Sequence, residues 1–177
     1  MKVVAFAGFS GAGKTTLIER LIPLLRERGQ RVSVVKHAHH GLEIDHPGKD
    51  TWRHREAGAY EVVAASPQRL VLIREFERPQ ALSVHDLIRS LHPGVDWVLV
   101  DGFRDCDLQK IEVWRAASAQ PVRYPDDPFI VAIATDSPKQ MPEPTQRPVL
   151  DLNVAQALAG WLFDNGERFV YNPEAHS

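Results

Sequence analysis

A complete phosphate-binding loop near the amino terminus constrains this chain more than any other feature. Residues 8–15 read Gly-Phe-Ser-Gly-Ala-Gly-Lys-Thr and match the pattern G-x-x-x-x-G-K-[ST] at every fixed position. In such a loop, glycines let successive backbone N–H groups turn toward a polyphosphate. The lysine reaches the outer phosphates, and the hydroxyl completes the coordination of Mg²⁺. We therefore expect an Mg-nucleotide to bind at Gly8, Ser10, Gly11, Ala12, Gly13, Lys14, Thr15 and Thr16.

The segments around this loop predict a parallel α/β fold. Apolar runs alternate with amphipathic segments, which is typical of βαβ units. We expect strands at 3–7, 32–36, 61–65, 70–74, 97–101, 111–114 and 129–135, and helices at 13–28, 50–58, 83–92 and 153–166. The spacing of Ser83 and Asp86 resembles a capping box at the start of the third helix. The link at 66–69 is too short for a crossover helix, so it predicts an antiparallel hairpin. The expected fold is three-layered and resembles P-loop NTPases, with a mostly parallel, mixed sheet.

Composition bounds the class of protein. With 177 residues, 44% of them hydrophobic, the chain predicts a single nucleotide-binding domain over 1–171, with Pro-rich loops at 115–128 and 137–148 and a frayed tail at 172–177. A formal charge of -2 argues against nucleic acid and anionic membranes as partners. Apolar runs fall well short of the roughly 20 residues that span a bilayer. A single cysteine excludes an intramolecular disulfide, so we expect a cytoplasmic protein.

Asp101 is the expected metal partner of the phosphate loop. It follows the apolar residues 97–100, and ligands gather at the carboxyl ends of strands in open α/β sheets. Phosphate loops need an acidic group there, because the metal is held from two sides of the phosphates. The sequence therefore predicts that Thr15 and Asp101 hold Mg²⁺.

Two further groups follow predicted strands. His37, His39 and His40 come after the second strand and suit anions, a transition metal or a second substrate. Thr135 and Asp136 end the seventh strand, where a carboxylate can accept hydrogen bonds from the guanine N1–H and 2-amino groups. The Asn-Lys-x-Asp sequence of switch-type GTPases is absent.

The chain resembles one family, the B protein of molybdopterin-guanine dinucleotide biosynthesis. The resemblance is carried by the loop at 8–16 and by Lys36-His37-x-His39-His40, Asp45-x-Pro47-Gly48-Lys49-Asp50, Ala57-Gly58-Ala59, Val100-Asp101-Gly102-Phe103, Lys110-Ile111 and Ala132-Ile133-Ala134-Thr135-Asp136. One departure is Asp101, where many relatives are expected to have Glu. A shorter carboxylate reaches less far toward a metal.

The resemblance implies a homodimeric GTP-binding adaptor with weak GTPase activity at most, which is not itself the nucleotidyltransferase. Its implied partner is the guanylyltransferase that joins GMP to molybdopterin, with molybdopterin or its carrier proteins as further partners. By position, Lys14 would neutralise phosphate, Thr15 and Asp101 would manage Mg²⁺, and Asp136 would favour guanine. A catalytic or partner-sensing contact would lie in the loop from His37 to Asp50, and Asp50 and Asp101 are the catalytic candidates.

Hydrolysis lacks an obvious catalytic group in the sequence. No arginine finger or water-positioning glutamine can be recognised, which agrees with weak turnover. Arg55, Arg104 and Lys110 are the cations that could serve.

Two other functions remain open at this point. A small-molecule kinase would use ATP or GTP, with Asp45 or Asp50 as general base. A nickel-type metallochaperone GTPase would bind a transition metal through His37, His39 and His40.

Overall fold

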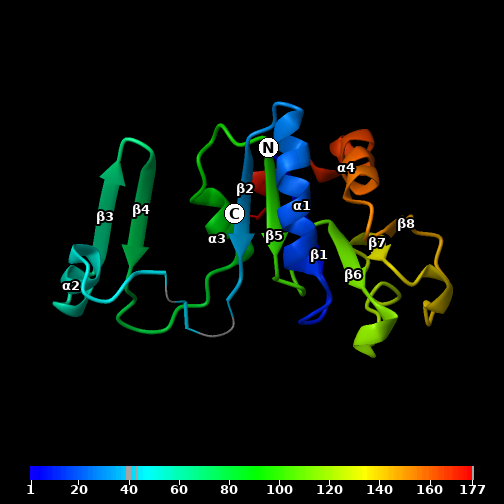
Figure 1. Ribbon diagram of the computed structural model, residues 1–177, viewed down its shortest axis with the longest axis horizontal. Coiled ribbons are helices and arrows are strands. Elements are labelled where there is room, and N and C mark those ends of the chain that lie inside the picture. The colour runs from blue at the N-terminus through cyan, green and yellow to red at the C-terminus, as the bar shows by residue number, and fades with distance from the viewer. Residues whose placement is uncertain (39–40, 43, 177) are drawn as a thin grey trace. The chain divides into compact units, whose positions relative to one another are not determined.

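The computed structural model of the protein describes residues 1–38, 41–42 and 44–176 (Figure 1). The chain divides into two compact units, one built from residues 1–37 and 83–177 and the other from residues 38–82. Compactness alone does not define a folding domain, so the single domain expected from the sequence stays a prediction. Across the described ranges, no helix is both long and apolar enough to cross a membrane.

The first unit is built on a six-stranded sheet. Its strands, in spatial order, are β2 (Val32–Lys36), β5 (Trp97–Asp101), β1 (Lys2–Ala7), β6 (Lys110–Trp114), β7 (Ile130–Thr135) and β8 (Val149–Asp151). Each neighbouring pair is parallel. The helices are α1 (Lys14–Glu27), α3 (Val84–Arg89) and α4 (Ala155–Asp164), with 3₁₀ turns at Ala116–Ser118, Pro138–Gln140, Gly166–Phe169 and Pro173–His176.

The alternation of side chains along β1 explains the three layers. Val4 and Phe6 join the core that includes residues of α1 and α4. Val3 and Ala5 join a second core with residues of α3. Because both faces are covered, residues 3–7 of β1 and 97–100 of β5 are continuous apolar runs, as expected for parallel strands between helices. The predicted three-layer α/β class with a mostly parallel sheet is confirmed.

The second unit contains α2 (Asp50–Glu56) and a hairpin of β3 (Glu61–Ser66) and β4 (Arg69–Arg74). The predicted antiparallel pairing is present, with Val63 opposite Leu72. The hairpin forms its own two-stranded sheet, however, and does not add antiparallel strands to the large sheet. The reason is that the hairpin belongs to the inserted segment 38–82, whose strands pair with each other.

Strand β8 was not expected from the sequence. It has three residues and directly follows Pro148, so it offers too few positions for an alternating pattern to be recognised. Helix α3 was expected, and its predicted cap is present. The Ser83 hydroxyl accepts from the Asp86 N–H, and the Asp86 carboxylate accepts from the Ser83 N–H.

A buried carboxylate holds the Pro-rich loop at 115–128 against the sheet. Glu112 in the middle of β6 is 1% exposed. Its two oxygens accept the backbone N–H groups of Arg123 and Tyr124, each at 2.8 Å. Burial raises the pKa of Glu112, and the two amide donors oppose that rise. The position of this loop therefore depends on the two carboxylate oxygens of Glu112. A side chain without a carboxylate does not supply this pair of acceptors.

We predict that Glu112→Ala lowers the free energy of unfolding by about 2–4 kcal/mol, because two amides lose their acceptors. The measurement is urea-induced unfolding followed by circular dichroism. Glu19→Ala on the exposed side of α1 is the matched control and should leave the midpoint within error. Equal midpoints for the two variants would contradict the role given to Glu112.

Candidate functional site

The phosphate loop connects the end of β1 to the start of α1, as the motif predicts. Three of its glycines have positive φ angles: 137° at Gly8, 79° at Gly11 and 100° at Gly13. L-residues with side chains rarely adopt such angles. At Gly8 there is also no room, because a Cβ would lie 2.4 Å from the carbonyl oxygen of Val113 in β6. The shape of the loop thus depends on both backbone freedom and contact with the neighbouring strand.

Four side chains converge beside the loop. The Lys14 ammonium donates to the carbonyl oxygens of Gly8 (2.8 Å) and Phe9 (2.9 Å). The Thr15 hydroxyl donates to Asp101 Oδ2 at 2.9 Å, and Lys36 Nζ lies 2.6 Å from the same oxygen. Together with other loop residues they line a pocket of about 260 Å³. Burial lowers the pKa of Lys14, while nearby Asp101 opposes this shift.

The residues present fit a magnesium ion. The Asp101 side chain is 4% exposed, and within the described part of the chain its Oδ1 atom has no hydrogen-bond partner. A buried carboxylate oxygen beside a threonine hydroxyl offers the hard oxygen ligands that Mg²⁺ prefers. Over the described residues no three His, Cys, Asp or Glu side chains gather. Mg²⁺ at phosphate sites needs only one or two carboxylates, because nucleotide and water supply the rest.

Asp101 stands where many relatives are expected to have Glu. Its 2.9 Å contact with Thr15 shows that the shorter side chain reaches the loop hydroxyl. The residues expected to bind phosphate and metal are therefore together at one edge of the sheet.

Arg115 is a site residue that the sequence reasoning missed. It directly follows β6, and its Nε donates to the Ala12 carbonyl oxygen of the loop at 3.1 Å. Its Nη1 atom donates to Asp136 Oδ2 at 2.9 Å. The signal was available, because Arg115 directly follows a predicted strand, the position at which ligands gather in open α/β sheets. Arg115 thus links the phosphate loop to the residue expected to read guanine.

A scan of protein families matches residues 3–136 to the model of MobB, described as molybdopterin guanine dinucleotide synthesis protein B. The chain belongs to the MobB family. It is 37% identical over 166 residues to the molybdopterin-guanine dinucleotide biosynthesis adapter protein of Haemophilus influenzae, covering 90% of this chain and 89% of the relative. The Escherichia coli protein of the same description is 35% identical over 164 residues, covering 92% and 91%.

Solved structures of MobB proteins have the same fold. A crystal structure of molybdopterin-guanine biosynthesis protein B superimposes with a TM-score of 0.69 at 26% identity, covering 92% of this chain and 98% of that one. Bacillus subtilis MobB gives a TM-score of 0.70 at 23% identity, covering 97% and 100%. These comparisons support the P-loop architecture of the first unit.

The base-reading candidates of this MobB-family chain lie at the carboxyl end of β7. Thr135 is buried, and its hydroxyl accepts from the Ser137 N–H. Asp136 accepts from Arg115 and from the Ser137 hydroxyl, at 2.7 Å on Oδ1. Each carboxylate oxygen has two lone pairs, so capacity for guanine N–H groups remains. Guanine recognition by Thr135 and Asp136 stays a prediction.

The histidine stretch is described only in part. His37 stacks on Phe103, with ring centroids 4.5 Å apart, and its N–H donates to the Asp101 carbonyl oxygen at 3.0 Å. This places His37 beside the strand end that carries Asp101. His39 and His40 lie outside the described residues. Their part in ligand binding stays a prediction.

Asp50 and Asp45 both belong to the second unit. Asp50 begins α2, and its side chain is 90% exposed, 3.9 Å from Arg53. Asp45 accepts from the Thr51 hydroxyl at 2.8 Å and pairs with Arg55 at 3.3 Å. These contacts and the backbone N–H of His46 outweigh desolvation and lower the pKa of Asp45. A catalytic role for Asp50 stays a prediction.

Lys110 was wrong as a candidate for stabilising a transition state. It begins β6, its side chain is 2% exposed, and its ammonium lies 2.6 Å from Asp127. A buried lysine held in an ion pair cannot move to a nucleotide without leaving the aspartate uncompensated. The other two candidate cations are also in ion pairs. Arg104 pairs with Asp105 at 3.4 Å, and Arg55 pairs with Glu75 at 2.5 Å.

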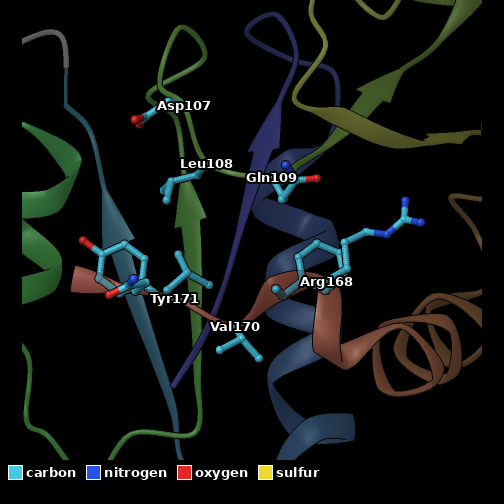
Figure 2. Close-up of a pocket in the computed structure, with 9 residues that line it drawn as sticks. Asp107, Leu108, Gln109, Arg168, Val170 and Tyr171 are labelled. Atoms are coloured by element: carbon cyan, nitrogen blue, oxygen red, sulfur yellow. The ribbon is translucent and has the colours of Figure 1, made fainter. Parts of the chain in front are cut away.

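A second pocket of about 260 Å³ lies where the segment 168–172 passes the start of β1. Figure 2 shows Tyr171 and Arg168 to either side of Val170. The Tyr171 hydroxyl lies 2.8 Å from His85 Nδ1, and His85 Nε2 lies 2.8 Å from Asp107. The three residues come from separate segments, so no sequence motif points to them. The phosphate loop takes no part in this pocket.

We predict that Gly8→Ala lowers the free energy of unfolding by about 2–4 kcal/mol, because it adds a clash with the Val113 carbonyl to an unfavourable φ. Gly11→Ala is the matched control. It also imposes a left-handed conformation, but a Cβ at Gly11 meets nothing within 4 Å, so its cost should be about 1 kcal/mol. Urea unfolding of both variants provides the measurement, and a Gly11 variant as damaged as the Gly8 variant would contradict the steric argument.

Proposed function

We propose that this MobB-family protein binds GTP with Mg²⁺ and acts as an adapter in molybdopterin-guanine dinucleotide biosynthesis. In this proposal it presents GTP to, or assists, the guanylyltransferase that joins GMP to molybdopterin. Molybdopterin or its carrier proteins are further partners, and the cytoplasm is the place of action. The relatives in Haemophilus influenzae and Escherichia coli carry the description of adapter proteins of this biosynthesis.

The observation that carries the proposal is the pairing of Thr15 with the buried Asp101 beside a complete phosphate loop. Mg²⁺, when bound, would be held by these two residues and would neutralise phosphate charge. Lys14 would turn from the loop carbonyls to the outer phosphates, and the amides of the loop at the start of α1 would bind the others. Asp136, 2.9 Å from Arg115, would accept the guanine N–H groups.

Weak hydrolysis is consistent with how the arginine of the site is held. Arg115 is paired with Asp136. A cation that stabilises phosphoryl transfer must be directed at the transferring phosphate. Arg115 would first have to leave Asp136, which supports a protein that holds GTP while its partner performs the transfer.

We also propose a homodimer, and the hairpin supplies a surface for it. Val63, Leu70 and Leu72 lie on one face of β3 and β4, and each residue is more than half exposed. Contiguous exposed apolar surface of this kind marks interaction sites. Light scattering of the samples used for titration reports the oligomeric state.

We predict that the protein binds GTP more tightly than ATP in Mg²⁺, and that Lys14→Ala abolishes binding without unfolding the chain. The lysine supplies the positive charge that reaches the phosphates, whereas its own contacts are with loop carbonyls. Calorimetric titration measures binding, and circular dichroism verifies the fold. A folded Lys14 variant with full affinity would contradict the assignment of the loop.

The same titrations distinguish the alternative functions. Binding that favours ATP, with turnover only when an acceptor is added, would support a small-molecule kinase. Stoichiometric binding of Ni²⁺ that is lost on replacing His37, His39 and His40 by alanine would support a metallochaperone.

We predict that Asp136→Asn lowers the ratio of GTP to ATP affinity by about tenfold or more, because an amide offers one acceptor where guanine presents two donors. Asp164→Asn, at the exposed end of α4, is the matched control. Damage to the loop through Arg115 would weaken GTP and ATP alike, so the ratio isolates base recognition. An unchanged ratio would assign guanine recognition to other residues.

A further inference from the structure

The contacts of Lys36 are not explained by the phosphate-loop motif. Its ammonium lies 2.6 Å from Asp101 Oδ2, the oxygen that also accepts from the Thr15 hydroxyl. Lys14, the lysine of the motif, donates instead to two loop carbonyls. Of the two lysines that line this pocket, Lys36 is therefore the one paired with the expected metal ligand.

Strand register places Lys36 at this position. Lys36 is the last residue of β2 and is the register partner of Asp101, the last residue of β5. The next residue fixes this pairing, because the His37 N–H donates to the Asp101 carbonyl oxygen. A shift of the register by one residue would turn Lys36 to the other face of the sheet. The ion pair is thus built into the sheet.

The two partners differ in their freedom to move. The Asp101 side chain is 4% exposed, whereas that of Lys36 is 53% exposed. A buried carboxylate without a cation is costly. A half-exposed lysine can move its ammonium into water at little cost. The carboxylate is therefore the fixed member of the pair, and the lysine is the member that can be exchanged.

We propose that Lys36 is the counter-ion of Asp101 when no Mg²⁺ is bound, and that Mg²⁺ displaces it when the metal–nucleotide complex enters. This inference rests on the proposed binding of GTP at the loop. Lys36 is a positioning residue here, since it acts through Asp101. If Lys36 neutralises Asp101 in this way, the protein also holds GTP in the absence of metal. The reason is that the ammonium of Lys36 cancels the repulsion between the Asp101 carboxylate and the phosphates.

Charge balance supports this exchange. Lys14 and Lys36 carry two positive charges at the pocket and Asp101 carries one negative charge, so the three sum to one positive charge. Without Lys36 the same sum is zero, and the phosphates would approach a buried carboxylate that only Mg²⁺ could compensate. The proximity of Lys36 also contributes to lowering the pKa of Lys14, as expected for two ammonium groups that face one pocket.

The test is calorimetric titration with GTP, once in Mg²⁺ and once in EDTA. For Lys36→Met we expect the affinity in EDTA to fall by about tenfold to a hundredfold relative to wild type, as for the loss of one member of a close charge pair. The affinity in Mg²⁺ should not fall, because in the variant the metal meets no competing ammonium at Asp101. Lys36→Arg keeps the charge and should behave as wild type, and Lys139→Met, at an exposed lysine outside the pocket, should have no effect.

A double variant provides the discriminating result. Adding Asp101→Asn to Lys36→Met removes the uncompensated carboxylate, so binding in EDTA should recover toward the wild-type value. A structural role of Lys36 would not produce this recovery. The GTP affinity in Mg²⁺ can be divided by the GTP affinity in EDTA for each protein. Equal ratios for wild type and Lys36→Met would overturn the inference while leaving the proposed GTP binding intact.

Failure of wild type to bind GTP in Mg²⁺ would overturn the proposed function, and a second measurement then tests Lys36 by itself. Added MgCl₂ without nucleotide should raise the melting temperature of Lys36→Met more than that of wild type. The reason is that the metal faces no competing ammonium in the variant. Equal rises in the two proteins would overturn the exchange of cations.

Discussion

The position of β5 between β1 and β2 is the constraint on which the site depends. Parallel pairing places Asp101, the last residue of β5, between two neighbouring strands. On one side it is in register with the end of β2, and on the other side with Phe6 near the end of β1. Asp101 therefore meets Lys36 directly by strand register, and it meets Thr15 where the phosphate loop leads from β1 into α1. The buried sheet supplies rigidity, and the residues just beyond its carboxyl edge supply the chemistry. Packing on both faces keeps this edge in place, because a slipped strand would bury the wrong side chains.

Much of this arrangement was readable from the sequence because it is local. The phosphate loop, the strand before it and the helix after it occupy consecutive residues, and their pattern predicted all three. Asp101 was found by a rule of position, as the acidic residue that ends an apolar strand. The hairpin at 61–74 was predicted from the length of its link, and the cap of α3 from Ser83 and Asp86. In each instance the determining residues lie within a few positions of one another.

The features that were missed depend on residues distant in the chain. Arg115 contacts Ala12 and Asp136 only after β6 has been placed beside β1 and β7 beside β6. The ion pair of Lys110 with Asp127, which removes it as a catalytic candidate, likewise follows from burial. The separate hairpin sheet could not be told from an edge of the main sheet, because strand pairing is a tertiary property. Local propensity says which segments are strands, and packing decides where they lie.

The contact between Gly8 and Val113 has a consequence for how the protein is made. The carbonyl that the loop packs against is synthesised about a hundred residues after the loop, at rates that give seconds of delay. Asp101 also arrives only shortly before Val113. A nascent chain ending before β6 thus carries the phosphate-loop sequence without its support from the neighbouring strand. Nucleotide recognition therefore requires translation at least as far as β6, well after the phosphate loop itself has been made.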